Sequence, residues 1–313
     1  MTDRPTTSGA ASPPFRCATA ARARGDAISG TAAPAYRWLL IEHPGPWHPE
    51  ALQGRGIRAD DAAAVAAAAT TWRARVVLVR RPGRQPAAAR GPEAERSWTV
   101  VDSRSGRQLG GTWTERRGLA AAAAALGAAD DEWEPATTRL LVCTHGMHDA
   151  CCAVRGRPVA AGLAQRWPEQ VWECSHLGGD RFAATMVVLP DGACYGGLDA
   201  RTADEVVAGH LTGRVVAEYL RGLATQSAPM QAAVVHALRE HGPAPIEAVR
   251  PVALERAGVE SWIATLAGSA PLPPRLVLQV RLTWDEPAQL TCRAAGQSAP
   301  LRYQVQAAAS RGG

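Results

Sequence analysis

The sequence predicts an α/β protein, because short apolar runs rich in Val, Leu and Ile alternate with Ala-rich segments of helical character. Its 313 residues allow one large domain or two ordinary ones with a sizeable core. No apolar run reaches the roughly 20 residues that a membrane helix needs. We therefore expect a soluble chain in which strands and helices alternate.

The chain is expected to begin with a flexible N-terminus, residues 1–34, followed by an N-terminal α/β region, residues 35–135. The first segment mixes small, polar and Pro residues and lacks the apolar stretch of a secretory signal, so we expect a cytoplasmic protein. Strand-like runs cover 36–42, 74–80 and 97–102, and Ala-rich helices are predicted over 60–73 and 117–129. A Pro- and Gly-rich loop follows the first strand, and residues 82–93 are expected to form a surface loop.

A second α/β unit is predicted over residues 136–225. Strands are expected at 138–143 and 171–174, with a helix at 158–167 that has Pro158 in its first turn. Pro190, Asp191 and Gly192 indicate a hairpin, and a long helix is predicted over 202–223 with Thr202 as its N-cap. The order strand, helix, strand, hairpin, helix is the thioredoxin-like pattern.

The remaining residues, 226–313, are expected to form a small α+β appendage. A helix is predicted from Ala228 to Arg239, then a second helix after a Pro-rich break, and finally strands near 275–283 and 301–305. No internal repeat stands out anywhere in the chain.

The net charge of +5 does not identify a partner. All 34 basic residues are Arg, and the chain contains neither Lys nor Asn, a bias typical of a GC-rich genome. Basic and acidic residues are interspersed, and no basic block with interleaved aromatic residues occurs. We expect neither a nucleic-acid nor a membrane partner.

Cysteine and histidine residues gather in one part of the sequence. Five of the seven cysteines and three of the eight histidines lie between positions 143 and 194. Cys143 ends a strand, and the Cys151-Cys152 pair follows a short Gly-containing loop, which suits the wrapping of a metal centre. No Cys-x2-4-Cys zinc knuckle and no Cys-x-x-Cys dithiol occurs, so the spacing favours a group larger than one ion.

The other cysteines and histidines are expected to have lesser roles. Cys17, Cys194 and Cys292 are predicted to be small buried apolar residues that take no part in the site. His145 and His148 are expected to lie near the metal centre or in solvent rather than to bind it.

Two segments carry a resemblance to a known family. They are Cys143-Thr-His-Gly-Met-His-Asp-Ala-Cys-Cys and Trp172-Glu-Cys-Ser-His-Leu-Gly-Gly-Asp-Arg-Phe-Ala-Ala, with similar segments at Gly30-Thr-Ala-Ala-Pro and Glu42-His-Pro-Gly-Pro-Trp. Together they resemble the sucrase/ferredoxin-like family over roughly residues 30–223. The resemblance implies a thioredoxin-like ferredoxin domain that carries electrons on a [2Fe–2S] cluster for a redox partner protein.

In the characterised fungal members of that family the cluster is bound by two cysteines spaced Cys-x8-Cys and two histidines spaced His-x3-His, and the resemblance implies the same ligands here. On this sequence Cys143 and Cys152 match the cysteines, and His176 matches the first histidine. Asp180 stands where the second histidine is expected. The fourth ligand stays open: Asp180 offers a hard oxygen, which sulfide clusters rarely take, and Cys174 would share a strand face with His176. Cys151 could replace or assist its neighbour.

Two other kinds of function are compatible with the same residues. One is a zinc-binding or thiol-based regulatory protein. The other is an enzyme with Cys143 or Cys152 as nucleophile, His176 as base and Asp180 as orienting group. No Gly-x-Gly-x-x-Gly fingerprint follows a strand, so the sequence indicates no dinucleotide site and favours a carrier over an enzyme.

Overall fold

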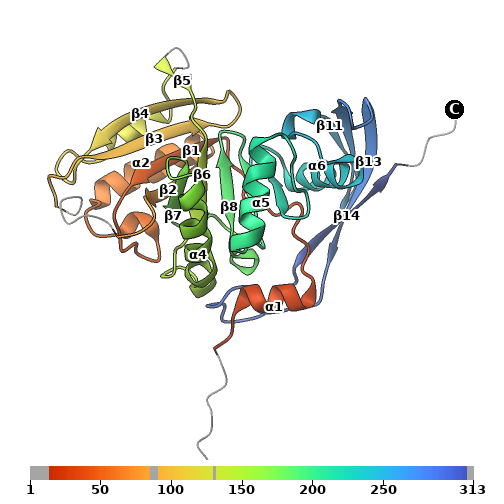
Figure 1. Cartoon of the computed structure of the whole chain (residues 1–313), viewed down its shortest axis with the longest axis horizontal. Helices are drawn as coiled ribbons and strands as arrows, with labels where there is room; N and C mark the ends of the chain where they lie inside the picture. The colour runs from red at the N-terminus through yellow and green to blue at the C-terminus, as the bar shows by residue number, and fades with distance from the viewer. Residues whose placement is uncertain (1–13, 85–90, 130–131, 309–313) are drawn as a thin grey trace, which may run out of the picture.

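We describe the protein from a computed structural model, which covers residues 14–84, 91–129 and 132–308. Over these residues the strands form a large sheet in the order β10-β9-β8-β6-β7-β2-β1-β3-β4-β5 and a small sheet in the order β11-β12-β13-β14. Helices pack on the large sheet, and α6 lies between it and the small sheet (Figure 1). This mixed architecture confirms the predicted α/β class.

The first unit of the large sheet spans residues 37–135. Its elements are β1 (Arg37–Glu42), η1 (Ala51–Gln53), α2 (Ala59–Thr71), β2 (Ala74–Arg80), β3 (Arg96–Asp102), β4 (Arg107–Trp113), α3 (Ala120–Ala125) and β5 (Glu134–Pro135). β1 pairs in parallel with β2 and antiparallel with β3, which in turn pairs antiparallel with β4.

The second unit spans residues 139–223 and repeats this arrangement. Its elements are β6 (Arg139–Cys143), α4 (Ala150–Arg166), β7 (Val171–Cys174), η4 (Asp180–Phe182), β8 (Met186–Leu189), β9 (Ala193–Tyr195), α5 (Ala200–Leu211) and β10 (Leu220–Leu223). β6 pairs in parallel with β7 and antiparallel with β8, which pairs antiparallel with β9. The strand order β9-β8-β6-β7 is the thioredoxin-like order, and the first unit has its counterpart, β4-β3-β1-β2.

The two units meet through an antiparallel pairing of β2 with β7, in which Val79 lies opposite Cys174. The chain therefore contains a repeat of topology that its sequence does not reveal. Strands at the centre are apolar on both faces, as Leu140, Leu141 and Val142 of β6 show, because helices or other layers cover both sides.

Two helix boundaries in the second unit differ from the prediction. α4 begins at Ala150 rather than at Pro158, since the Asp149 carboxylate caps it by accepting a hydrogen bond from the Cys151 N–H at 2.8 Å. Pro158 consequently lies inside the helix. The predicted long helix over 202–223 is also wrong: α5 ends at Leu211, and β10 follows. Gly213, in the left-handed region at φ 70°, allows the chain to turn there.

The N-cap of α5 is Asp199 rather than Thr202. Thr202 is the third helical residue, where its hydroxyl and backbone complete a capping box with Asp199. The Ala-rich segment over 117–129 is helical only from Ala120 to Ala125.

The C-terminal part contains α6 (Ala228–His241), η5 (Ile246–Ala248), β11 (Val249–Gly258), β12 (Ser261–Gly268), β13 (Arg275–Trp284) and β14 (Leu301–Ala307). The second helix expected after the Pro-rich break is wrong, because β11 and β12 occupy that stretch as an antiparallel pair. One apolar core runs from β6 and β8 through α6 to β12 and β13.

A helix, α1 (Cys17–Arg24), lies within the segment that was expected to be flexible. Its residues Cys17, Ala18 and Ala21 are buried, and the helix packs against η4. It lies below the lower ends of α4 and α5, beside the segment that joins β13 to β14 (Figure 1). Residues 1–13 and part of the predicted 82–93 loop lie outside the described residues.

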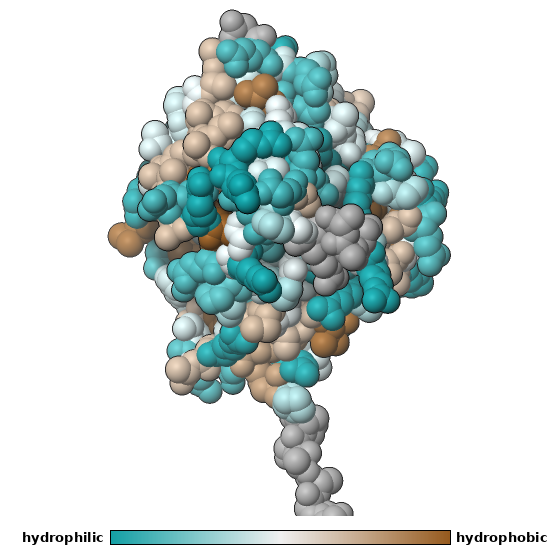
Figure 2. All heavy atoms as spheres, turned by 90° about the vertical axis from the view of Figure 1, so that its left-hand side faces the viewer, coloured by the Kyte–Doolittle hydropathy of each residue, from teal (hydrophilic) through white to brown (hydrophobic). Residues whose placement is uncertain are grey.

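The outer face of the first unit is largely hydrophilic. Hydrophobic residues on it are scattered rather than gathered into one patch (Figure 2). Among the described residues, no helix combines the length and the apolar character that crossing a membrane requires.

Candidate metal centre

The carboxyl ends of β6 and β7 bring the predicted site residues together. Cys143 is the last residue of β6, Cys152 lies in the first turn of α4, and His176 follows β7. The sulfur atoms of both cysteines and a ring nitrogen of His176 lie within 4.8 Å of one another. Both cysteines are buried, whereas His176 is partly exposed.

A glycine permits this approach. A Cβ atom on Gly156 of α4 would overlap the carbonyl oxygen of Cys143. The absence of a side chain at position 156 therefore lets α4 lie close enough to β6 for Cys152 to meet Cys143.

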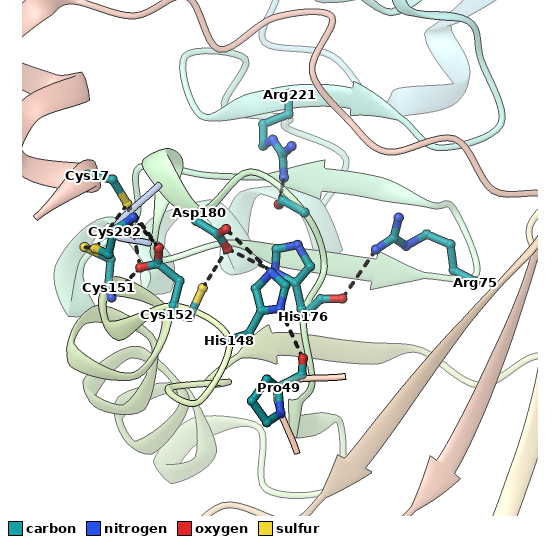
Figure 3. Close-up of polar contacts among 12 residues, drawn as sticks. Cys17, Pro49, Arg75, His148, Cys151, Cys152, His176, Asp180, Arg221 and Cys292 are labelled. Atoms are coloured by element: carbon teal, nitrogen blue, oxygen red, sulfur yellow. Dashed lines mark hydrogen bonds and ion pairs between the residues drawn. The ribbon is translucent and has the colours of Figure 1, made fainter. Parts of the chain in front are cut away.

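Asp180 joins this group from η4. Its Oδ1 atom lies 3.0 Å from Nδ1 of His176, and it accepts a hydrogen bond from the Cys152 thiol at 3.2 Å. The close-up shows Cys152, Asp180 and His176 directed toward one another (Figure 3). The carboxylate stands at the position of the expected second histidine and contacts two of the predicted ligands.

A buried arginine holds the loop that carries His176 and Asp180. Arg221 donates a hydrogen bond to the Gly178 carbonyl at 2.8 Å and others to Thr31. Gly178 and Gly179 have φ of 87° and 81°, and a Cβ at position 179 would collide with the guanidinium group. The two glycines therefore serve both the backbone conformation and the packing of Arg221.

His148 lies closer to the site than the sequence suggested. Its ring stacks on that of His176 with centroids 3.7 Å apart, and its Nε2 lies 3.8 Å from Oδ2 of Asp180. His148, His176 and Asp180 form a second set of ligand atoms within 4.8 Å. The sequence held one signal for the role of His148. Asp180 replaces the expected second histidine, and His148 is a further histidine only four positions before Cys152.

His145 links the site to the first unit. Its Nε2–H donates to the His48 carbonyl at 2.9 Å, while His148 Nδ1 lies 3.2 Å from the Pro49 carbonyl. The Nδ1 atom of His145 is buried and has no hydrogen-bond partner among the described residues. The loop after β1 thus contacts the candidate site of the second unit.

The pKa values of the four site residues shift in different directions. Contact with Cys152 lowers the pKa of the Cys143 thiol well below its usual range despite burial, and His176 adds to the effect. Contact with Cys143, together with burial, raises the pKa of Cys152. Burial lowers the pKa of His176, but the close approach of Asp180 and of Cys143 outweighs burial and raises that pKa to about 9. Burial raises the pKa of Asp180, and contact with His176 more than offsets it, so the net direction is down.

The other candidate, Cys174, lies opposite Cys143 in the β6–β7 pairing and is fully buried. Burial raises its pKa. In the part of the chain that the structure describes, its sulfur joins none of the groups of ligand atoms. Cys194 in β9 also stands apart, and its thiol donates to the Gly192 carbonyl at 3.6 Å.

Cys17 is buried in a small apolar cluster, as predicted, and Cys292 is only partly buried, but neither cysteine is isolated. Together with Cys151 and Asp149 they form a further group of ligand atoms within 4.8 Å. Sequence spacing could not reveal this group, because its members are up to 275 positions apart.

Comparison with known families supports the assignment made from the motifs. The model of the sucrase/ferredoxin-like family matches residues 28–222. The chain belongs to this family. The match covers both units of the large sheet and confirms the resemblance inferred from the sequence. Among curated proteins, none matches this sucrase/ferredoxin-like chain.

Solved structures similar to this sucrase/ferredoxin-like chain include two cysteine-to-serine variants of the thioredoxin-like [2Fe-2S] ferredoxin from Aquifex aeolicus. Each is 21% identical, covers 27% of this chain and 97% of that chain, and has a TM-score of 0.24. A further structure of a thioredoxin-like [2Fe-2S] ferredoxin from the same organism is 20% identical, with coverages of 26% and 88% and a TM-score of 0.24. Because the sequence identities and TM-scores are this low, these structures carry no argument of their own. The thioredoxin-like assignment depends on the strand order of the second unit.

Proposed function

We propose that this protein is an electron carrier with a [2Fe–2S] cluster held by Cys143, Cys152, His176 and Asp180. The observation that carries the proposal is the convergence of two buried thiols and one imidazole from the ends of β6, α4 and β7 within 4.8 Å. We further propose that it exchanges electrons with a redox partner protein.

The donor set suits the cluster. Thiolates are the usual ligands of iron–sulfur clusters, and imidazole replaces thiolate in those of higher potential. When bound, the cluster supplies one-electron chemistry. The partly exposed edge of His176 would let electrons leave at the surface, while the buried cysteines keep the sulfur ligands away from solvent.

Asp180 supports the proposal through its contacts with Cys152 and His176. Cys174 has no comparable contact with either residue, so we assign the fourth position to Asp180. A carboxylate is a hard ligand and binds a sulfide cluster less firmly than thiolate does. We expect the cluster to be more easily lost than one with four sulfur or nitrogen ligands.

The enzyme alternative finds less support in the geometry. Cys143 and Cys152 are each only 1% exposed, so neither sulfur could meet a substrate without a rearrangement of the site. A single zinc ion would also fit ligands this close together. Colour and iron content distinguish the carrier from both alternatives.

The test is anaerobic purification followed by metal analysis and spectroscopy. We expect red-brown protein with about two irons per chain and an EPR signal after reduction. Cys143→Ser and Cys152→Ser should each abolish the colour, whereas the matched control Cys194→Ser should keep it. A colourless wild-type protein that still lacks iron after reconstitution would refute the proposal.

A further inference from the structure

A second group of metal-ligating side chains lies beside the proposed cluster, and the proposed function does not use it. It consists of Cys17 in α1, Asp149 and Cys151 at the start of α4, and Cys292 in the segment between β13 and β14. Figure 3 shows Cys17, Cys151 and Cys292 gathered at one point, to one side of Cys152 and Asp180.

The distances within this group match the ligands of one tetrahedral ion. The sulfur of Cys292 lies 3.5 Å from that of Cys151 and 3.6 Å from that of Cys17. The sulfur of Cys17 lies 3.7 Å from each carboxylate oxygen of Asp149. With zinc–sulfur bonds of about 2.3 Å, tetrahedral geometry sets neighbouring sulfur atoms about 3.8 Å apart.

We propose that Cys17, Cys151, Cys292 and Asp149 bind a single zinc ion in a structural site. All four ligand atoms of this group lie within 4.8 Å of one another, a spacing that one four-coordinate ion accommodates. Zinc accepts this mixture of thiolates and one carboxylate in a closed tetrahedron.

The surroundings of the group are those of a closed site. Cys17, Cys151 and Asp149 are almost completely buried, and Cys292 is partly buried. The backbone N–H groups of Cys151 and Cys292 donate to the two oxygens of Asp149 at 2.8 and 2.7 Å. These hydrogen bonds fix the orientation of the carboxylate, as the outer partners of metal ligands commonly do.

Binding needs no oxidant or reductant. The three thiols lose their protons to the solvent as three zinc–sulfur bonds form, and the carboxylate supplies the fourth bond. The ion would join α1, α4 and the segment after β13, which are separated by 132 and 141 positions along the chain. Because Cys151 adjoins Cys152, the ion would also fix the helix turn that presents Cys152 to the proposed cluster.

The first test is metal analysis of the full chain purified anaerobically without added chelator. We expect about one zinc per chain in the wild type, its loss in Cys17→Ser and Cys292→Ser, and its retention in the control Cys194→Ser. The two serine variants should keep their iron and visible absorption, and Cys143→Ser should lose iron while keeping zinc. Zinc content that is equal in the wild type and Cys17→Ser would overturn the proposal.

The second test does not depend on the folding of the Cys17 or Cys292 variants. The double variant Cys143→Ser/Cys152→Ser, which lacks the cysteine ligands of the proposed cluster, is stripped of bound zinc with a chelator, freed of the chelator, and titrated as the apoprotein with Co²⁺. We expect thiolate-to-cobalt absorption and visible bands of tetrahedral intensity that saturate at one equivalent. Absence of these bands, or a Cys151–Cys292 disulfide in the anaerobically purified protein, would contradict a zinc site. Loss of iron throughout with zinc retained would refute the proposed function alone.

Discussion

Asp180 occupies the position at which the family pattern has its second histidine, and its surroundings make it the residue of greatest consequence in the site. It is buried, yet its carboxylate contacts both Cys152 and His176 and lies near His148. A histidine at position 180 would place a softer nitrogen ligand there. The side chain at position 180 therefore matters most for our assignment of the fourth ligand of the proposed cluster.

Substitution distinguishes the candidates for that ligand. We expect Asp180→Ala to change the EPR spectrum of the reduced protein and to lower its iron content by at least half, because a ligand is removed. Cys174→Ala should leave the spectrum unchanged, since its sulfur joins no group of ligand atoms among the described residues. An unchanged spectrum for Asp180→Ala with an altered one for His148→Ala would assign the fourth position to His148.

His43, which follows β1 in the first unit, is buried as a neutral imidazole. Its Nε2–H donates to the Arg55 carbonyl at 2.9 Å, and its Nδ1 accepts from the Gly45 N–H at 3.1 Å. Burial lowers the pKa of His43, with a further contribution from Arg96. The unfolded chain therefore takes up a proton at His43 at a higher pH than the folded protein does.

Stability should consequently fall as the pH drops from 7.5 to 5.5, through the ordinary histidine pKa of about 6.5. His43→Gln keeps a donor for the Arg55 carbonyl but cannot titrate. We expect the variant to lose less free energy of unfolding over this interval than the wild type, as measured by urea denaturation at both pH values. Equal losses in the two proteins would show that His43 does not contribute.

The close packing of helix α4 on strand β6 brings Cys152 next to Cys143. Two glycines in α4 differ in their surroundings. A Cβ at Gly156 would overlap the Cys143 carbonyl, whereas one at Gly162 would meet only the Ala200 side chain at 3.9 Å.

We expect Gly156→Ala to destabilise the protein by about 2 kcal/mol or more, because α4 must move away from β6. Gly162→Ala should be neutral or stabilising by up to about 1 kcal/mol, since alanine favours helix. Thermal unfolding measures both changes, and iron content after reconstitution should fall only in Gly156→Ala. Similar unfolding temperatures for the two variants would contradict the close approach of α4 and β6.

The whole molecule is held together by a core that crosses the predicted boundary at residue 226. Ala233, Val234 and Val235 of α6 share one apolar cluster with Leu140 of β6 and Val280 of β13. Gln231, fully buried in the same helix, donates to the carbonyls of Ala32 and Leu223 and accepts from the Ala32 N–H. The C-terminal part therefore contributes to the stability of the second unit.

A chain that ends at Gln226 should accordingly lose its cooperative unfolding transition and bind a hydrophobic dye such as ANS, because truncation exposes the core face beneath α6. Calorimetry and dye fluorescence, compared with the full chain, measure this. A soluble truncated protein with the same unfolding temperature would show that residues 227–313 are an independent appendage.

The large sheet also shows how the units differ in chemistry despite a common topology. β1 leads to His43 and a Pro-rich loop, whereas the corresponding strand β6 leads to Cys143 and the Cys151-Cys152 pair. The first unit has the same strand topology as the second. It also supplies the His48 and Pro49 carbonyls that contact His145 and His148.

The α/β class could be predicted from the sequence, because strand and helix patterns depend on neighbours a few positions away. The family and the grouping of Cys143, Cys152 and His176 were predicted from the resemblance of several separate motifs to a known family. Helix ends were less predictable: Asp149 and Asp199 act as caps only because the backbone around them has the geometry for it.

The contacts between residues far apart in the sequence became visible in the folded structure alone. It placed Cys17 and Cys292 beside Cys151, stacked His148 on His176, and revealed two units of one topology with little likeness in sequence. No spacing rule encodes such contacts, since they arise from the packing of helices and loops on a sheet whose strands are far apart along the chain. The physical reason is that local conformation depends on sequence neighbours, whereas a metal site depends on how separate elements pack.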